Sequence, residues 1–314
     1  MPSRFKLPRD SKESNSSIVL QPERACGSSV DRLSVGADEM HQSVKDPGQT
    51  HESVESGSRC FSKSMSNIPT NSEKCCFASV PDPEKVNIIC LPYAGGDGAC
   101  YIRWRNLLGG AIAVHPVQLP GRGQRFDEPP CIDLVELSQM ILSDLAPFFD
   151  VDYAILGTSM GAWIGAELCR SISSLGLPPP LALVVCSAAS PHDRGRLPDI
   201  NQHDNTEVIE KLVRFNPNLS RLITHPELVE LAIPMLKADL TACIDWVPKA
   251  GVWFDWPIYG FRGEQDTITQ ASSMKRWRLV TGNRFELWSI DGDHFFVDDP
   301  SADFLAQLAA LLVE

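Results

Sequence analysis

The sequence lacks a long hydrophobic run. None of its apolar stretches approaches the roughly 18 residues that a membrane-spanning helix needs, and no hydrophobic segment of the secretory type follows the first residues. We therefore expect neither secretion nor a membrane partner, and we expect a cytoplasmic location. The early basic residues Arg4, Lys6 and Arg9 leave an organellar leader open, although the acidic Asp10 and Glu13 count against one.

Positive charge is also scarce. The 314 residues include 28 Lys and Arg against 40 Asp and Glu, a net charge of −12, and we expect no nucleic-acid partner because such binding depends on basic residues. The chain has no His-Glu-x-x-His and no Gly-x-x-x-x-Gly-Lys-Ser/Thr, and its histidines are scattered singly. We therefore expect no metal and no cofactor. The apolar run around His115 favours a core or edge histidine over a ligand.

Trp and Tyr are missing from the first part of the chain. Residues 1–83 contain neither, are rich in Ser, Asn, Asp, Glu and Lys, and show no sustained apolar period. Such a composition buries too little apolar surface to fold. It predicts a disordered Ser-rich N-terminal extension, residues 1–83, before a folded domain, residues 84–314. The 10 cysteines are irregularly spaced and are expected to stay reduced, with Cys90, Cys169 and Cys186 on apolar strand or helix patterns.

The most informative segment that is present is Gly157-Thr158-Ser159-Met160-Gly161. The aliphatic run Tyr153–Leu156 precedes it, and a helical pattern, Ala162–Ile172, follows it. A serine hydroxyl is a weak nucleophile, so catalysis needs it on a sharp strand-to-helix turn that a base can reach, and flanking glycines permit that turn. The segment therefore predicts a nucleophile elbow in which Ser159 is the nucleophile.

Partners for Ser159 follow in the chain order that an α/β-hydrolase requires, which is serine, acid and then histidine. His294 comes after the strand-like segment Phe285–Ile290, on a loop near the end of the chain. Asp266 follows the apolar segment Trp256–Phe261, which places it at the carboxyl end of a strand. We predict that Ser159, Asp266 and His294 form a catalytic triad.

Two further carboxylates compete with Asp266 for the role of the acid. Asp291 and Asp293 adjoin His294 on the same loop. The acid that orients the imidazole normally comes from the preceding strand and meets the other ring nitrogen, so we prefer Asp266 and keep the other two as alternatives.

An earlier glycine-rich loop supplies the remaining part of such a site. The apolar strand Val86–Leu91 is followed by Pro92-Tyr93-Ala94-Gly95-Gly96, in which the glycines let the backbone approach a ligand. The amides of Ala94 and Met160 are the expected donors of an oxyanion hole. Together these features predict an α/β fold of the α/β-hydrolase type, with a mostly parallel central sheet flanked by helices.

Several segments stand in a fixed order along the chain: Pro92-Tyr93-Ala94-Gly95-Gly96, Trp104, Gln118-Leu119-Pro120-Gly121-Arg122-Gly123-x-Arg125 with Glu128-Pro129-Pro130, the serine elbow, Pro234-Met-Leu-Lys-Ala-Asp239 and Gly292-Asp293-His294-Phe295-Phe296. In this order they resemble the type II thioesterase family, the external thioesterases of polyketide, nonribosomal peptide and fatty acid synthesis. The resemblance runs from about Val86 to the C-terminus.

The resemblance implies hydrolysis of acyl groups from the phosphopantetheine arm of an acyl or peptidyl carrier protein, for editing or for chain release, by a monomer that uses the triad above. A general carboxylesterase or lipase would use the same triad on oxygen esters and stays the alternative. The chain departs from the family at Thr158, where His is usual, and at Asp293, where Gly is usual. A carboxylate at 293 either raises the basicity of the imidazole or faces solvent, and we favour solvent.

A long insertion before Trp256–Phe261 shows helical patterns at about Glu207–Phe215, Pro226–Leu231 and Ile233–Trp246, which predict a helical lid over about residues 191–250. Its apolar side chains either line an acyl channel or pack on the core, and their helical spacing favours packing for most of them. Carrier docking would need a local basic patch. The candidates, which are otherwise solvated surface charges, are Arg103, Arg105, Arg122, Arg125, Lys275, Arg276 and Arg278.

Overall fold

The computed structural model describes residues 76–77, 79–108, 110–195 and 225–313. Residues 1–75 of the expected extension and the lid helix expected at Glu207–Phe215 lie outside the described residues. The described part of the expected extension packs on the domain. Cys76 is buried, its N–H donates to Asp144 Oδ2 at 2.6 Å, and Phe77 forms a β-bridge with Val117. The contacts of the domain therefore begin before the boundary expected at residue 83.

The centre of the domain is a parallel sheet of six strands in the order β2-β1-β3-β4-β5-β6. Near-continuous apolar runs form its central strands, as expected for strands that are covered on both faces. The predicted α/β fold with a mostly parallel sheet is confirmed. The strands are β1 Val86–Leu91, β2 Ile112–Pro116, β3 Tyr153–Thr158, β4 Leu183–Cys186, β5 Ile258–Gly263 and β6 Phe285–Ile290.

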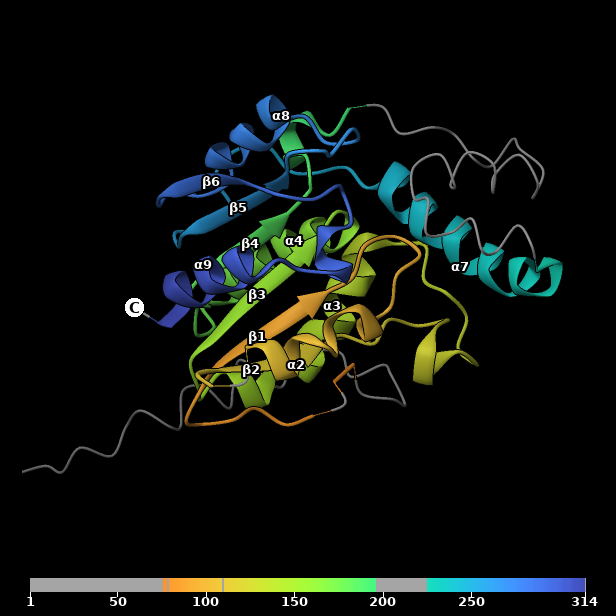
Figure 1. The fold of residues 1–314 in the computed structure, drawn as a ribbon, viewed down its shortest axis with the longest axis horizontal. Helices are drawn as coiled ribbons and strands as arrows, with labels where there is room; N and C mark the ends of the chain where they lie inside the picture. The colour runs from red at the N-terminus through yellow and green to blue at the C-terminus, as the bar shows by residue number, and fades with distance from the viewer. Residues whose placement is uncertain (1–75, 78, 109, 196–224, 314) are drawn as a thin grey trace, which may run out of the picture. The chain divides into compact units, whose positions relative to one another are not determined.

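Helices cover both faces of the sheet (Figure 1). Alternate residues of β1 show the two layers, because Ile89 packs with α3 Leu134–Asp144 and α4 Met160–Leu175, whereas Ile88 packs with α9 Ala302–Val313. The shorter helices are α2 Trp104–Leu107 and α8 Ala271–Lys275, with 3₁₀ turns η1 Gly98–Tyr101, η2 Gly123–Arg125, η3 Ala146–Phe148, η4 Pro191–Asp193, η6 Arg276–Leu279 and η7 Phe296–Asp298.

The strand order places the loops that follow β1 and β3 at the point where the chain changes direction across the sheet. β1 pairs with β2 on one side and with β3 on the other. In open α/β sheets a ligand binds at such a switch point, outside the carboxyl ends of the strands. Both segments that were predicted to bear the nucleophile and the oxyanion donors leave the sheet here.

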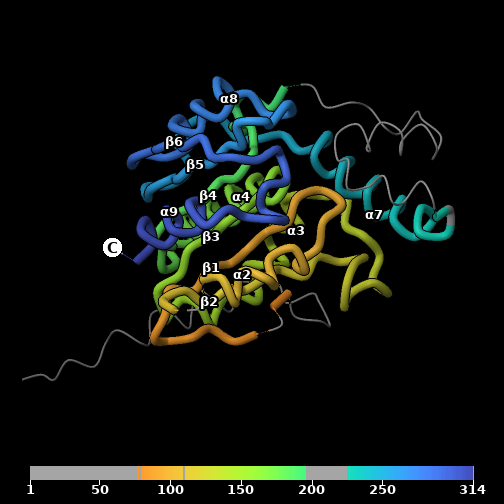
Figure 2. Tube along the Cα trace, in the orientation of Figure 1, coloured from red at the N-terminus to blue at the C-terminus, as the bar shows by residue number. Residues whose placement is uncertain are grey.

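From residue 225 onward, the described part of the lid is one long helix, α7 Pro226–Asp245, and Figure 2 traces it as a single coil. The prediction of two separate helices over this range was wrong. Pro234 lies inside the helix, and its ring is on the exposed side. The helix continues because residues on both sides of Pro234, among them Ile233 and Leu236, are buried against the domain, and this packing outweighs the lost hydrogen bond.

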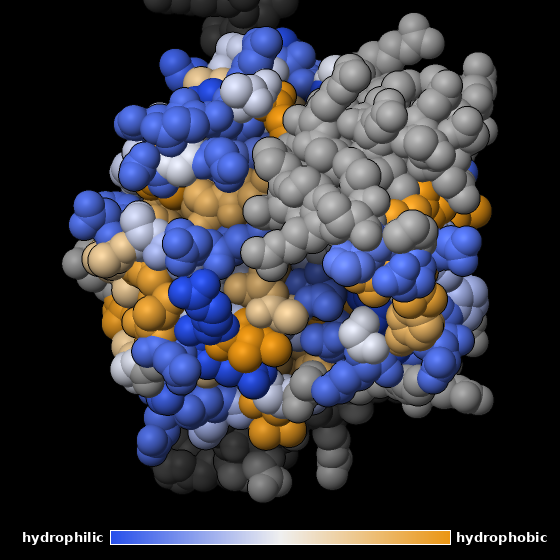
Figure 3. Space-filling view, turned by 45° about the vertical axis from the view of Figure 1, so that its right-hand side comes forward, coloured by the Kyte–Doolittle hydropathy of each residue, from blue (hydrophilic) through white to orange (hydrophobic). Residues whose placement is uncertain are grey.

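The apolar lid residues were expected either to line an acyl channel or to pack on the core, with packing favoured for most of them. Leu236 is buried, whereas Leu228 and Leu231 on α7 are 43% and 55% exposed. Figure 3 shows hydrophobic side chains on one face of the molecule as separate patches among hydrophilic ones. The apolar residues between 212 and 223 lie outside the described residues.

The thiols of the described cysteines are free, as expected. Burial raises the pKa of Cys90, Cys169 and Cys186, so these thiols stay protonated and unreactive. No helix among the described residues combines the length and the apolar character that crossing a membrane requires.

His115 is a core histidine, as predicted. Its ring is 3% exposed, and its Nε2 lies 2.9 Å from Asn87 Oδ1, an acceptor, so Nε2 bears the proton. Nδ1 then accepts from the Ser79 hydroxyl at 2.9 Å. Burial, assisted by the charge of Arg105, lowers the pKa of His115 to about 4. The native state therefore holds this imidazole neutral.

His115→Gln is expected to weaken the acid sensitivity of the fold. Between about pH 6.5 and pH 4 the unfolded chain binds a proton at His115 that the native state does not bind, so stability falls as the pH falls through this window. One proton corresponds to at most about 1.4 kcal/mol per pH unit. Urea unfolding at a series of pH values measures the slope. An unchanged slope in the variant would contradict the assignment.

Candidate active site

Ser159 stands on the turn between β3 and α4, as the sequence predicted. Its φ of 52° and ψ of −115° are unusual for a residue with a side chain, and such local strain is typical of functional turns. The Ser159 N–H donates to Cys186 O at 2.9 Å, and its carbonyl accepts from Ala162 N at 3.0 Å. Both neighbouring strand and helix therefore hold the turn.

The two glycines of the elbow are required by close backbone contacts. A Cβ at Gly157 would lie 2.2 Å from Gly161 O, and one at Gly161 would lie 2.3 Å from Leu91 O. Helix α4 therefore begins directly against the end of β1. This packing brings the first amide of α4 next to the loop that follows β1.

Thr158, where His is usual in the resembled family, is fully buried beneath the elbow. Its hydroxyl lies 2.8 Å from Tyr101 Oη, and the Tyr101 hydroxyl donates to Leu91 O at 3.0 Å. Thr158 must then donate to Tyr101. The threonine is satisfied by hydrogen bonds, and it ties β3 to η1.

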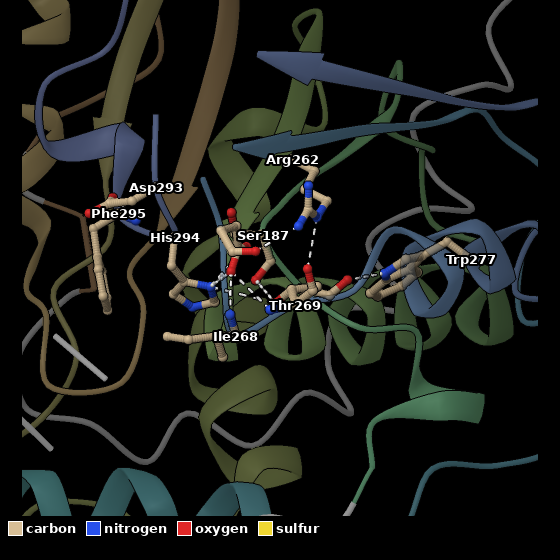
Figure 4. Close-up of polar contacts among 10 residues, drawn as sticks. Ser187, Arg262, Ile268, Thr269, Trp277, Asp293, His294 and Phe295 are labelled. Carbon is tan, nitrogen blue, oxygen red and sulfur yellow. Dashed lines mark hydrogen bonds and ion pairs between the residues drawn. The ribbon is translucent and has the colours of Figure 1, made fainter. Parts of the chain in front are cut away.

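His294 and Asp266 form a buried pair at the carboxyl ends of β5 and β6. Nδ1 of His294 lies 3.1 Å from Asp266 Oδ2 and 3.2 Å from Oδ1, and their side chains are 7% and 0% exposed. Figure 4 shows His294 with Thr269 and Ile268 close to its ring. An ionised carboxylate accepts the Nδ1 proton, which leaves Nε2 as the basic nitrogen.

Two backbone amides fix the Asp266 carboxylate. Oδ1 accepts from Ile268 N at 2.8 Å and from Thr269 N at 2.9 Å. Burial disfavours the charge, but the hydrogen bond and charge interaction with His294 and these amides outweigh it, so the pKa of Asp266 lies below its ordinary value. Asp266 is therefore ionised at neutral pH.

The competing carboxylates lie elsewhere. Asp291 and Asp293 are exposed, and Asp293 Oδ1 accepts from Phe295 N at 2.7 Å. Asp293 thus faces solvent and caps the turn that follows His294, as was favoured over a direct effect on the imidazole. Of the three candidate acids, the structure brings Asp266 to the histidine.

The expected oxyanion donors lie on the two loops at the switch point. Met160 is the first residue of α4, and the first amides of a helix have no partner within it. Ala94 is the second residue of a turn closed by Gly96 N donating to Tyr93 O at 2.9 Å. The Ala94 amide takes no part in that turn bond.

A contact that the sequence did not indicate joins this turn to the histidine loop. The Tyr93 hydroxyl donates to both carboxylate oxygens of Asp298, at 2.9 and 3.0 Å, and its ring meets that of Phe295 edge-on at 4.9 Å. Burial raises the pKa of Asp298, although the tyrosine hydrogen bond opposes this effect. The loop that holds His294 and the loop that holds Ala94 are therefore fastened together.

The sequence also did not indicate the roles of Arg262 and Thr269, which both shape the loop that carries Asp266. Arg262, on β5, donates to Asp266 O at 2.6 Å and to Thr269 O at 2.8 Å, as Figure 4 shows in part. The Thr269 hydroxyl donates to Ser187 O at 3.1 Å. An aspartate whose side chain accepts amides two and three residues later is a recognised turn signal, but it does not reveal the arginine beneath.

The basic residues considered for docking divide into two groups. Lys275, Arg276 and Arg278 are exposed, as are Arg103 and Arg105. Arg122 and Arg125 are only 3% and 2% exposed, so neither of the two readings, docking patch or solvated charge, was right for them. Each pairs with a carboxylate, Arg122 with Asp239 and Arg125 with Glu128, at 2.6 Å.

Among the described residues, no group of three or more His, Cys, Asp and Glu side chains is placed to hold a metal ion. The polar groups described at this site are the serine turn, the imidazole–carboxylate pair and the backbone amides around them. A parallel sheet that presents these groups in the order serine, acid and histidine, with the serine on a strand-to-helix turn, defines an α/β-hydrolase.

The chain belongs to the thioesterase domain family, whose model matches residues 86–309. It is similar to the gramicidin S biosynthesis protein GrsT of Aneurinibacillus migulanus, with 30% identity over 70% of this chain and 86% of that protein. It is also similar to the medium-chain S-acyl fatty acid synthase thioesterase of Rattus norvegicus, with 29% identity over 77% of this chain and 94% of that protein.

Solved structures of related proteins support the same family assignment. The RedJ thioesterase from the prodiginine pathway of Streptomyces coelicolor superimposes with a TM-score of 0.67 at 29% identity and covers 77% of this chain and 97% of its own. The type II thioesterase BorB from the borrelidin cluster gives 0.68 at 26% identity, with 77% and 100% covered. The predicted resemblance to type II thioesterases is confirmed, and the protein is a thioester hydrolase.

Proposed function

We propose that this enzyme hydrolyses acyl thioesters from the phosphopantetheine arm of an acyl or peptidyl carrier protein, through a serine acyl-enzyme. The observation that supports this most is a strained Ser159 turn at the carboxyl end of β3 together with a buried His294–Asp266 pair on the loops after β5 and β6, in a chain of the thioesterase family. The names of its relatives place them in peptide antibiotic and fatty acid synthesis, where acyl groups are bound as thioesters.

In the first half of the reaction, Ser159 Oγ attacks the thioester carbonyl carbon while His294 Nε2 takes the hydroxyl proton. Asp266 holds the Nδ1 proton and stabilises the imidazolium. The amides of Ala94 and Met160 donate to the oxyanion of the tetrahedral intermediate. The carbon–sulfur bond then breaks, and the imidazolium returns its proton to the leaving thiol.

In the second half, water attacks the acyl-serine while His294 Nε2 accepts its proton. The bond from the acyl carbon to Ser159 Oγ breaks, and the proton returns to the serine. The products are a carboxylic acid and the free carrier thiol. The same sequence of steps serves editing and product release, which differ in the acyl group and not in the chemistry.

The test compares one acyl group on three leaving groups: a carrier protein, coenzyme A and p-nitrophenol. We expect kcat/KM to be at least about tenfold higher for the carrier-bound thioester, because contacts with the carrier add binding energy that the reaction can use. Release of the acid is followed by mass spectrometry. Faster cleavage of the oxygen ester would move the assignment to a general carboxylesterase.

A further inference from the structure

A carboxylate from the lid helix is buried at the turn that holds Ala94. Asp239 lies on α7 and has no exposed surface. Its Oδ2 accepts from Gly95 N at 2.7 Å. Figure 1 shows the loop that follows β1 reaching toward this helix. Residues 144 positions apart therefore meet at the oxyanion turn.

Arg122 completes this contact from the other side. Its Nη1 and Nη2 donate to Asp239 Oδ2 and Oδ1 at 2.8 and 2.6 Å, and Nη1 also donates to Gly96 O at 3.0 Å. Both charged side chains can be buried because each compensates the charge of the other, which offsets the free-energy cost of removing them from water. Together they hold the N–H of Gly95 and the carbonyl of Gly96.

The helix also packs directly on this turn. A Cβ at Gly95 would lie 2.2 Å from Leu236 Cδ2, so no other residue fits there without movement of the helix. The φ of Gly95 is 78°, the value that the third position of a type II turn requires. Leu236 and Asp239, three residues apart on one face of α7, thus enclose Gly95.

The hydrogen bond between Gly95 N–H and Asp239 determines which amide of the turn remains for the substrate. Gly95 N–H is bonded to Asp239 and Gly96 N–H to Tyr93 O, so of these three consecutive amides only that of Ala94 is outside both bonds. Type I and type II turns differ by a flip of the central peptide, here the one between Ala94 and Gly95. A flip would turn the Ala94 carbonyl toward the Asp239 carboxylate, which repels it.

We infer that Asp239, supported by Arg122, is a positioning residue: by holding the Gly95 N–H it fixes the turn that carries the Ala94 N–H, the proposed oxyanion donor, at its place beside the lid helix. This inference rests on the proposed function. The lid helix is thereby part of the support of the oxyanion hole. Loss of one oxyanion donor costs about 10²–10³ in kcat in other hydrolases, and a displaced donor costs part of that.

Two double variants isolate the acceptor for Gly95. Arg122→Met with Asp239→Leu removes both charges and the acceptor, whereas Arg122→Met with Asp239→Asn removes both charges and keeps an amide oxygen for Gly95 N–H. Replacing both partners of a buried ion pair by uncharged groups preserves folding better than removing one. If the Leu variant does not fold, Arg122→Met with Asp239→Ala, which also removes both charges but adds no bulk, is compared with the same Asn variant.

We expect kcat to fall about 10- to 100-fold in the Leu variant with KM within about threefold of wild type, and to stay within about fivefold of wild type in the Asn variant. A boronic acid inhibitor, which mimics the tetrahedral intermediate, should weaken in parallel with kcat. Glu128→Gln, at the neighbouring Arg125 pair, is the matched control and should leave kcat unchanged while lowering Tm.

Equal kcat in the two double variants, or losses that follow Tm alone across all variants, would overturn the inference and leave Asp239 a merely structural residue. The assays use whichever ester class the wild-type enzyme cleaves. Failure of the wild type on carrier thioesters would count against the proposed function, and it would still leave the comparison of variants decisive for Asp239.

Discussion

Ser159→Ala is expected to lower the rate of thioester hydrolysis by about four to six orders of magnitude. The Ser159 hydroxyl is the proposed nucleophile, because the neighbouring Thr158 hydroxyl is buried and hydrogen-bonded to Tyr101, and the alanine leaves the histidine pair and the backbone amides in place. The remaining hydrolysis would come from direct attack of water on a thioester that the enzyme still binds and whose oxyanion the backbone amides still stabilise. Acid release in excess enzyme, followed over hours, measures it.

A second serine provides a matched control. Ser187, at the end of β4, also has a positive φ of 46°, and its buried hydroxyl has no hydrogen-bond partner among the described residues. Ser187→Ala removes a hydroxyl from a similarly strained position and is expected to keep activity within about threefold, because it leaves no partner unpaired. A fluorophosphonate probe should label the wild type and Ser187→Ala, but not Ser159→Ala.

Retention of more than about a tenth of the activity in Ser159→Ala would identify a different nucleophile. The described cysteines are poor substitutes because burial keeps the pKa of thiols such as Cys90 and Cys186 high. Mass spectrometry of the acylated wild-type enzyme would then locate the residue that forms the covalent bond. The same experiment on an active wild type tests the acyl-enzyme step itself.

The sheet was largely predictable because buried parallel strands are continuous apolar runs. β1 and β6 occupy the ranges expected, whereas β5 was expected two residues early, at Trp256–Phe261. Its end is set by its neighbour, since Arg262 and Gly263 pair with Ser289 and Ile290 of β6. A polar residue at a strand end has no apolar signal, and only the partner strand fixes where pairing stops.

Helix α3 was not predicted, although its signals are present in the sequence. Asp133 caps it by accepting from the amides of Val135 and Glu136, and Leu134, Leu137 and Ile141 are buried at helical spacing. An aspartate before such a series is a standard start signal. The sequence therefore contains enough local information to predict this helix.

The long-range polar contacts around the site could not be predicted in this way. Arg122 and Asp239 are 117 residues apart, and each alone resembles an ordinary surface charge in its segment. Tyr93 and Asp298 are separated by 205 residues. Local sequence indicates where a charge is, but its partner depends on which loops the sheet brings to one edge. The chain order of serine, acid and histidine was predictable because the strand order fixes it.

Asp266→Asn is expected to lower kcat by about 10⁴ while the fold and KM change little. The asparagine oxygen can still accept from the amides of Ile268 and Thr269, which now bond Oδ1 of the aspartate. Its amide nitrogen then faces His294 as a donor, so Nδ1 must become the acceptor and the proton moves to Nε2. An imidazole in that tautomer cannot take the proton of Ser159.

The pH dependence separates this effect from a loss of stability. The pKa of Asp266 is lowered in the native state, so its stabilising contribution is present above the unfolded value of about 3.9 and is lost as the pH falls through the native value. The variant should therefore be less stable than wild type at pH 7, with the difference shrinking as the pH falls below about 3.9. The activity deficit should persist at all pH values where both proteins are folded.

The exposed carboxylates beside the histidine give the control. Asp293→Asn can keep the cap on Phe295 N and is expected to change kcat less than about threefold, because the carboxylate is in solvent and screened from the imidazole. A loss near 10⁴ in Asp293→Asn with little loss in Asp266→Asn would reverse the assignment of the acid. Two amides and the Arg262 guanidinium beneath the loop hold Asp266 in place before substrate binds. Because the side chain cannot turn to present its oxygen to His294, replacing one carboxylate oxygen by NH₂ in Asp266→Asn is expected to cost the full loss in kcat.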